Sequence, residues 1–214
     1  MGFAYEENDG IETWENVVFR YRAALKKVTL EMEILNDEFE DLRDYNPIEH
    51  IKSRLKEPES IVKKLKRNGY DSTIENMVNY ISDIAGVRII CSFTSDIYKL
   101  AERIAGLDSL KVIQIQDYIS QPKPSGYMSY HMLVSTPVSV NGREVDTPVE
   151  IQIRTVAMDF WASLEHKIQY KFDSGVNVPV YISNELRECA KFVRNLDARM
   201  LALNNALQDS MTEE

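Results

Sequence analysis

Apolar residues near both ends of the chain recur at alternating spacings of three and four, which is the period of one face of an α-helix. The first set comprises Trp14, Val18, Tyr21, Leu25, Val28, Met32, Leu35, Phe39 and Leu42. The second set comprises Ile182, Leu186, Cys189, Val193, Leu196, Met200, Leu203 and Leu207. These patterns predict long amphipathic helices over about 12–44 and 181–210, each with an apolar side that must pack on the domain or on another copy of the chain.

The stretch after the first helix begins with helical signals. Pro47 follows Asn46, a good helix cap, and Asn68 provides a stop, so we predict a helix across 47–68 with a kink or break at Pro58. Shorter helices are predicted over about 73–80, 95–106 and 156–171.

Four further segments have the composition and spacing of β-strands. They are GVRIICSF (86–93), LKVIQIQDYI (110–119), YHMLVSTPV (130–138) and VEIQIRT (149–155). Asn141 and Gly142 separate the last two and favour a tight hairpin turn. Strands mixed with helices indicate an α+β fold, with a mixed β-sheet of about five strands and flanking helices. We expect one domain over 1–214, with its core at about 46–172.

Composition narrows the classes of function. The chain has 214 residues and a formal net charge of −9, which argues against general electrostatic binding to nucleic acid or to an anionic membrane. A site for an anionic ligand must therefore be local. The two cysteines, Cys91 and Cys189, lie far apart, and the sequence shows neither a signal peptide nor a long apolar run. We expect a cytoplasmic protein with reduced thiols and no membrane segment.

A basic segment stands out against this acidic background. Between positions 52 and 67 the chain carries Lys52, Arg54, Lys56, Lys63, Lys64, Lys66 and Arg67, against only Glu57 and Glu59. On one helix Lys56, Ser60 and Lys64 would be spaced by four, so two ammonium groups and a hydroxyl would face one direction. Such a face suits a polyphosphate, although a solvated basic surface would have the same composition.

Two carboxylates are candidates for metal binding and catalysis. Alternation along VEIQIRT places Glu150, Gln152 and Arg154 on one face of a strand, opposite its apolar residues. Asp83 comes just before another strand, which carries Arg88. Two carboxylates at one sheet edge, together with phosphate oxygens, are a usual arrangement for Mg²⁺. The alternatives are a solvated outer face for the Glu150 row and a helix cap for Asp83.

The loop DYISQPKPSGYMSYH (117–131) is rich in turn-forming residues and leads directly into a strand. It presents Lys123 and Tyr127, and His131 follows four residues after the tyrosine. A tyrosine at such a position can stack on a nucleobase, and the alternative is an ordinary core tyrosine. The chain contains none of the GxxxxGK[ST], GxGxxG, HExxH or paired CxxC motifs, so common nucleotide, dinucleotide and zinc mechanisms have no support.

Five segments, in order, resemble the synthetase domain of the RelA/SpoT family in the compact form called small alarmone synthetases. They are RLKEPESIVKKLKR, DIAGVRI, DYISQPKPSGYMSYH, VEIQIRT and AMDFWASLEHKIQYK, which together span about 54–171. The resemblance implies a nucleotidyltransferase-like synthetase fold and transfer of the β,γ-pyrophosphate of ATP to the 3′-hydroxyl of GDP or GTP. The products would be ppGpp or pppGpp, plus AMP.

The resemblance also implies roles for individual residues. On the ATP side, Arg54 and Arg88 would sandwich the adenine, and Lys56, Ser60 and Lys64 would hold the phosphates. The acceptor side would comprise Tyr127, stacked on guanine, with Lys123, His131 and Gln152. Asp83 and Glu150 would be the catalytic carboxylates that hold Mg²⁺, and Glu150 would also accept the proton of the attacking hydroxyl.

Two alternatives to this function remain at the level of sequence. One is a toxic relative that passes pyrophosphate to the 3′ end of tRNA, which the acidity of the chain disfavours. The other is a nucleotide-binding or RNA-binding regulator without catalysis. The terminal helices further suggest a homo-oligomer, by resemblance a tetramer, with (p)ppGpp and single-stranded RNA as candidate regulators.

Overall fold

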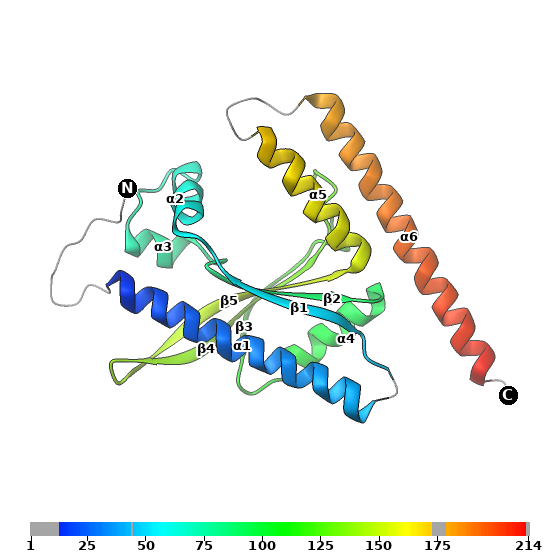
Figure 1. The fold of residues 1–214 in the computed structure, drawn as a ribbon, viewed down its shortest axis with the longest axis horizontal. Helices are drawn as coiled ribbons and strands as arrows, with labels where there is room; N and C mark the ends of the chain where they lie inside the picture. The colour runs from blue at the N-terminus through cyan, green and yellow to red at the C-terminus, as the bar shows by residue number, and fades with distance from the viewer. Residues whose placement is uncertain (1–12, 44, 173–178, 213–214) are drawn as a thin grey trace.

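A mixed sheet between helices forms the centre of the molecule in the computed structural model, which describes residues 13–43, 45–172 and 179–212 (Figure 1). In these ranges the helices are α1 (Trp14–Leu42), α2 (Pro58–Arg67), α3 (Ile74–Tyr80), α4 (Thr94–Ala105), α5 (Val156–Phe172) and α6 (Val180–Thr212). The strands are β1 (Ile48–Leu55), β2 (Ala85–Cys91), β3 (Lys111–Asp117), β4 (Tyr130–Val140) and β5 (Arg143–Thr155). The expected α+β class and the long terminal helices are confirmed.

The order of the strands is β1-β2-β5-β4-β3, with β2 and β5 parallel and the other neighbours antiparallel. Partners in register project from the same face of a sheet. One row across all five strands is therefore polar on that face: Lys52, Arg88, Gln152, His131 and Gln116. The neighbouring row places Arg54, Gly86 and Glu150 side by side. The register alone brings residues from distant parts of the chain onto one surface.

The opposite face of the sheet is apolar and covered by α1, which runs across β1, β2, β4 and β5 (Figure 1). Tyr21, Val28 and Met32 of this helix are fully buried, as predicted from their spacing, and they pack in one core with Ile151 and Ile153 of β5. Burial of the apolar residues of β5 on one face thus fixes the direction in which its polar residues point, toward the other face.

The tight hairpin turn predicted from Asn141 and Gly142 is present between β4 and β5. Asn141 and Gly142 both adopt positive φ, 51° and 77°, as a two-residue turn of this hand requires. No helix within the described ranges combines the length and apolar character needed to cross a bilayer.

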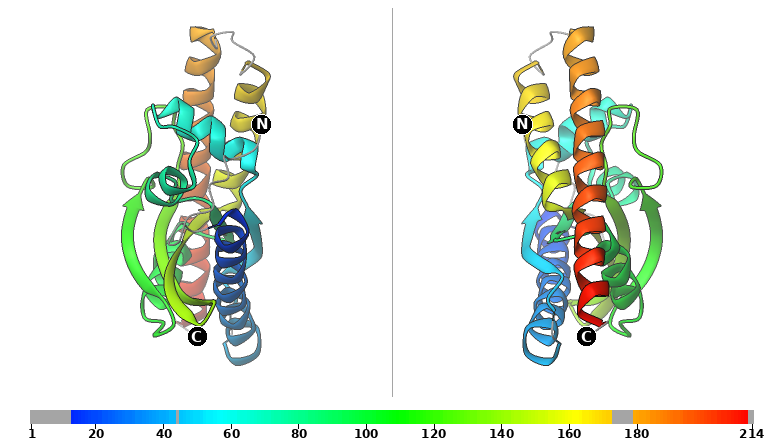
Figure 2. Two further views of the ribbon diagram at one scale, coloured as in Figure 1. Left: turned by 90° about the vertical axis from the view of Figure 1, so that its left-hand side faces the viewer. Right: turned by 90° about the vertical axis from the view of Figure 1, so that its right-hand side faces the viewer.

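Helix α6 lies at the outside of the molecule, beside α5, and the right-hand view of Figure 2 shows it in front of the other elements along its length. The indole Nε1 of Trp161 donates to the carbonyl oxygen of Leu186 at 3.0 Å, and Thr155 Oγ1 donates to Asp197 Oδ2 at 2.7 Å. Several apolar residues of α6 are nevertheless at least 49 % exposed: Phe192, Leu196, Met200, Leu203 and Leu207.

The helix predicted across 47–68 is wrong in its first half. Ile48–Leu55 is instead the edge strand β1, and α2 begins at Pro58, which occupies the first helical turn where its missing N–H is not needed. Lys56 therefore precedes α2 and does not share a helical face with Ser60 and Lys64. The edge strand has one mostly solvated face, so it lacks the apolar alternation of the inner strands.

Candidate active site

Two lysines meet at Asp83, which lies in the turn before β2. Lys56 Nζ is 2.5 Å from Asp83 Oδ2, and Lys64 Nζ on α2 is 2.8 Å from Oδ1. Burial raises the pKa of Asp83, but the hydrogen bonds and charges of the two lysines outweigh it and hold the pKa below its usual value. The convergence expected for Lys56 and Lys64 is present, although it depends on a loop and a helix and not on one helical face.

Glu150 is held between two polar neighbours on the sheet. His131 Nδ1 of β4 is 3.1 Å from Glu150 Oε1, and Gln152 Nε2 donates to Oε2 at 2.6 Å. Burial raises the pKa of Glu150, as does the nearby charge of Asp83, whereas the contacts with His131 and Gln152 lower it, and the net direction is down. Glu150 is thus an ionised carboxylate close enough to Asp83 to feel its charge.

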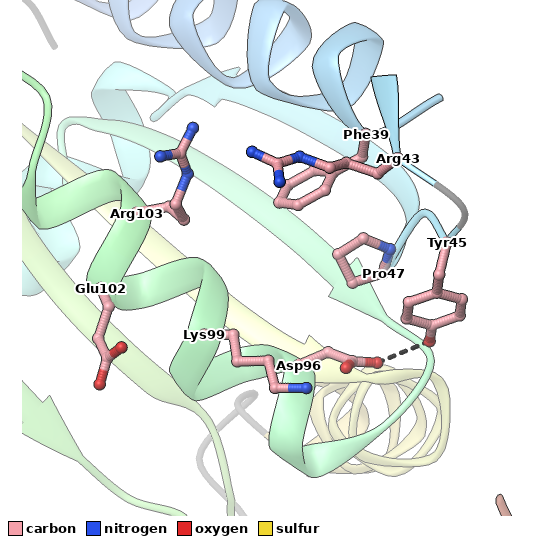
Figure 3. A pocket seen from close by; sticks show the side chains of 8 residues that line it. All are labelled: Phe39, Arg43, Tyr45, Pro47, Asp96, Lys99, Glu102 and Arg103. Atoms are coloured by element: carbon pink, nitrogen blue, oxygen red, sulfur yellow. Dashed lines mark hydrogen bonds between the residues drawn. The ribbon is translucent and has the colours of Figure 1, made fainter. Parts of the chain in front are cut away.

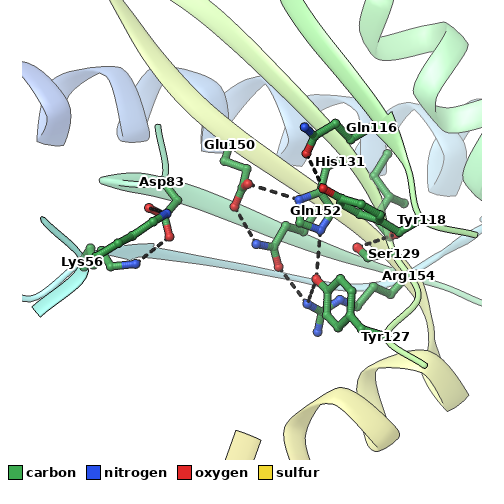
Figure 4. Close-up of polar contacts among 12 residues, drawn as sticks. Lys56, Asp83, Gln116, Tyr118, Tyr127, Ser129, His131, Glu150, Gln152 and Arg154 are labelled. Atoms are coloured by element: carbon green, nitrogen blue, oxygen red, sulfur yellow. Dashed lines mark hydrogen bonds and ion pairs between the residues drawn. The ribbon is translucent and has the colours of Figure 1, made fainter. Parts of the chain in front are cut away.

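The contacts of Glu150 belong to a closed ring of hydrogen bonds (Figure 4). Tyr127 Oη is 2.9 Å from His131 Nε2, and Arg154 Nη2 donates to Tyr127 Oη at 2.6 Å and to Gln152 Oε1 at 2.9 Å. An ionised Glu150 assigns the proton to His131 Nδ1, so Nε2 accepts from the tyrosine hydroxyl. Each contact in the ring then pairs one donor with one acceptor, which fixes the orientation of the side chains.

The two arginines expected on the ATP side lie on β1 and β2. Arg54 is exposed, whereas Arg88 is half-buried and forms an ion pair with Asp159 at 3.2 Å. Burial lowers the pKa of Arg88, and the charges of Arg154 and Arg54 lower it further. Arg54 therefore lies close enough to Arg88 to act on it electrostatically. Ser60 is exposed on α2, one turn before Lys64.

The loop before β4 carries the remaining acceptor residues. Lys123 Nζ lies 4.4 Å from the ring centroid of Tyr118 and 5.0 Å from that of Tyr127, within the range of cation–π attraction. Tyr118 also meets the ring of His131 edge to face at 5.1 Å. Tyr127 and His131 are thus members of one aromatic and polar cluster.

The structure decides between two interpretations of the Glu150 row. Its side chains are not a solvated outer face, because Glu150 is 17 % exposed and Arg154 only 5 %. Three residues of the cluster were given no role from the sequence: Tyr118, Arg154 and Asp159. Alternation had already placed Arg154 on the same face as Glu150, whereas nothing in the spacing singled out Asp159, which lies beyond the strand on α5.

Asp83 and Glu150 supply donor groups suited to a hard cation. Among the described residues no group of three or more His, Cys, Asp or Glu could hold a metal by itself. Two neighbouring carboxylates, with Asp83 raising the pKa of Glu150, fit Mg²⁺, which takes one or two carboxylates and completes its shell with phosphate oxygens and water.

A separate pocket of about 580 Å³ lies between the end of α1 and α4 (Figure 3). Phe39, Arg43, Tyr45 and Pro47 line one side, and four residues of α4 line the other: Asp96, Lys99, Glu102 and Arg103. Tyr45 Oη donates to Asp96 Oδ2 at 2.8 Å across this space. None of the residues predicted to handle nucleotide lines the pocket, so the candidate site is the polar face of the sheet.

Comparison with known proteins agrees with this geometry. Residues 53–175 match the region found in RelA/SpoT proteins. The chain is 45 % identical over 193 residues to the GTP pyrophosphokinase YwaC of Bacillus subtilis, covering 90 % of this chain and 91 % of that protein.

Solved structures extend the comparison to the fold. The small alarmone synthetase 1 from Bacillus subtilis bound to its product pppGpp superposes with a TM-score of 0.85 at 32 % identity, covering 91 % of this chain and 98 % of that one. The same enzyme bound to AMPCPP gives a TM-score of 0.76 at 29 % identity, covering 92 % and 99 %. The expected synthetase fold is confirmed, and the chain belongs to the RelA/SpoT family, among its small alarmone synthetases.

Proposed function

We propose that this protein transfers the β,γ-pyrophosphate of ATP to the 3′-hydroxyl of GDP or GTP, giving ppGpp or pppGpp plus AMP. The observation that carries the proposal is the placement of one ionised carboxylate, Glu150, between two groups of residues. The lysines at Asp83 lie on one side, and the ring with His131 and Tyr127 lies on the other. A GTP pyrophosphokinase 45 % identical over most of the chain supports it.

On the ATP side, the lysines would exchange one anionic partner for another. Lys56 and Lys64 are held by Asp83, and a triphosphate offers more negative charge in the same region. Arg54 and Arg88 would flank the adenine with their guanidinium planes, a contact that lysine does not reproduce. Ser60, one turn from Lys64, would add a hydroxyl to the same phosphates.

On the acceptor side, Tyr127 would stack on guanine, with Lys123 and Gln152 nearby. His131 donates through Nδ1 to Glu150, which keeps the carboxylate ionised and oriented. Glu150 would accept the proton of the 3′-hydroxyl while the oxygen of that hydroxyl forms a bond to the β-phosphorus of ATP. The bond from that phosphorus to the oxygen shared with the α-phosphate breaks, and AMP leaves.

Asp83 and Glu150 would together hold Mg²⁺. When bound, the cation supplies neutralisation of phosphate charge. Asp83 is the better placed of the two for this role once Lys56 and Lys64 turn to the phosphates, because both of its oxygens are then released.

The experiment that tests the function is incubation of the purified protein with γ-labelled ATP, Mg²⁺ and either GDP, GTP or uncharged tRNA, followed by thin-layer separation. We expect label in a guanosine tetraphosphate or pentaphosphate, with an equal amount of AMP. Label on tRNA alone would instead select the toxin activity. Nucleotide binding without AMP would indicate a regulator.

We also propose that the chain works as one synthetase domain and assembles as a homo-oligomer, a tetramer by resemblance, through its terminal helices. The support is the exposed apolar side of α6, together with Phe19, Leu30 and Ile34 of α1, each more than half exposed. Light scattering at micromolar concentration tests the assembly. A mass near that of one chain, 24.7 kDa, would refute it.

A further inference from the structure

Asp159 occupies the first turn of α5, directly after the strand that carries Glu150. Its side chain is 18 % exposed, and a single oxygen, Oδ1, receives two guanidinium groups. Arg88 Nη1 is 3.2 Å away and Arg154 Nη1 is 3.0 Å away. One carboxylate oxygen is thus the shared partner of two arginines from different strands.

The two arginines lead to different halves of the active site. Arg88 lies on β2 opposite Lys52 of β1, and the charge of Arg54 lowers its pKa, on the side expected to bind ATP. Arg154 donates to Tyr127 Oη, and its Cζ lies 5.0 Å from the centroid of the tyrosine ring, on the side expected to bind the acceptor. Asp159 therefore links Arg88 to Tyr127 through a continuous chain of contacts that also includes Arg154.

The positive charges of Arg88 and Arg154 explain why a carboxylate is needed between them. Burial and the charge of Arg154 both lower the pKa of Arg88, whereas the charge of Asp159 raises it. Without Asp159, two neighbouring and largely buried guanidinium groups would repel each other and separate. The Nε atoms of both arginines are buried without a hydrogen-bond partner among the described residues, so the protein groups around them do not satisfy every guanidinium donor.

We propose that Asp159 is a positioning residue that couples the two nucleotide sites. The inference rests on the proposed function, because it concerns how ATP and the guanine nucleotide affect each other. Adenine docked against Arg88 fixes the carboxylate of Asp159, which holds Arg154 and so sets Tyr127 for the acceptor base. Linkage makes the effect reciprocal, so an acceptor bound at Tyr127 strengthens the binding of ATP by the same factor.

The test measures this coupling directly, by titration calorimetry with AMPCPP, in which a methylene bridge between the α- and β-phosphates prevents transfer. The dissociation constant of AMPCPP is determined without GDP and with saturating GDP, and the coupling factor is the ratio of the two. For the unaltered protein we expect a factor of about 5 or more, the low end of ordinary allosteric coupling. For Asp159→Asn, which keeps the shape but removes the charge, the factor should fall below about 2.

The matched control is Asp146→Asn, the same change at an exposed position near the hairpin end of β5, where Asp146 pairs with Pro137 of β4. It should keep the coupling factor of the unaltered protein. A purely structural role for Asp159 would lower the melting temperature or weaken both nucleotides separately, without removing their mutual effect. A folded Asp159→Asn protein with an unchanged factor overturns the inference, as does a factor of one in the unaltered protein.

If Asp159→Asn does not fold, Tyr127→Phe tests the same path from its other end. This variant loses the hydroxyl that receives Arg154, so the coupling factor should fall while AMPCPP alone binds as before. A factor equal to that of the unaltered protein overturns the inference here too. A failure of the proposed function gives a different result. In that case the protein would bind both nucleotides with coupling but would transfer no label.

Discussion

The two halves of the candidate active site are held together in different ways. On the side proposed to bind ATP, Lys56 and Lys64 are ion-paired with Asp83, and we expect these pairs to be exchanged for pairs with phosphate. On the side proposed to bind the acceptor, a closed ring of hydrogen bonds joins Glu150, His131, Tyr127, Arg154 and Gln152. The proposed donor half would thus exchange its ion pairs when a polyphosphate binds, whereas the hydrogen-bonded ring would hold Glu150 in one orientation before the acceptor binds.

The largest effect should come from breaking the acceptor ring at its carboxylate. Glu150→Gln preserves shape but removes the proton acceptor and one negative charge, so we expect transfer to fall by about 100-fold or more with the fold intact. Single-turnover transfer of label from ATP measures the effect, and the melting temperature reports the fold. Glu144→Gln, at an exposed position of the same strand, is the control. A rate above about a tenth of the original would refute the role of Glu150.

The donor half should respond selectively to loss of a lysine. Lys64→Met removes one cation at Asp83, and we expect the KM for ATP to rise by about 10- to 100-fold, the range for one hydrogen bond to a charged group. The KM for the acceptor should change by less than about twofold. Lys63→Met, the preceding and exposed lysine of α2, should leave both values unchanged. Equal effects on both substrates would show that the halves are not separable in this way.

The acceptor loop should respond selectively to a small steric change. A Cβ added at Gly126 would lie 2.6 Å from the Cβ of Ala190 on α6, so Gly126→Ala must displace the loop that carries Tyr127. We expect the KM for the acceptor to rise by about 5- to 10-fold, with the KM for ATP little changed. Gly142→Ala is the matched control, because its φ is also positive but nothing lies within 4 Å. If the two variants behave alike, backbone strain and not the contact with α6 is responsible.

The smallest effect concerns stability and pH on the donor side. The lysines hold the pKa of Asp83 below its value in the unfolded chain, about 4, so the stabilisation is complete above that value and is lost as the pH falls through the folded pKa. We expect Asp83→Asn to lower the free energy of unfolding by about 1 kcal/mol at pH 7 and by less at pH 3. Urea unfolding at the two pH values measures this. A deficit that grows toward acid pH would contradict the assigned ionisation.

Most of the fold follows from local patterns, and the exception is instructive. In β5, apolar and polar residues alternate from Val149 to Arg154, because one face of the strand lies in the core. In β1, Ile48, Ile51 and Leu55 are spaced by three and four after a proline, which is the pattern of a helix start. The strand forms because it pairs with the edge of β2. Pairing with a distant segment cannot be predicted from the local sequence pattern.

The candidate site likewise contains residues that local spacing predicts and residues that only long-range pairing brings together. Tyr127 and His131 were grouped from their spacing of four, and their atoms meet at 2.9 Å. The register of β2 with β5 brings Arg88 beside Gln152, which no periodicity within one strand could reveal. Asp159 was missed because its importance depends on two arginines that approach it from separate strands.

The attachment of α6 has a consequence for how such enzymes diversify. Its contacts with the site elements, through Leu186, Ala190 and Asp197, fall within the first eighteen of its 33 residues. The outward side of the remainder carries Leu203 and Leu207, which are 66 % and 61 % exposed. If the proposed assembly forms through this side, substitutions there would change which copies meet without altering the residues proposed to handle nucleotide.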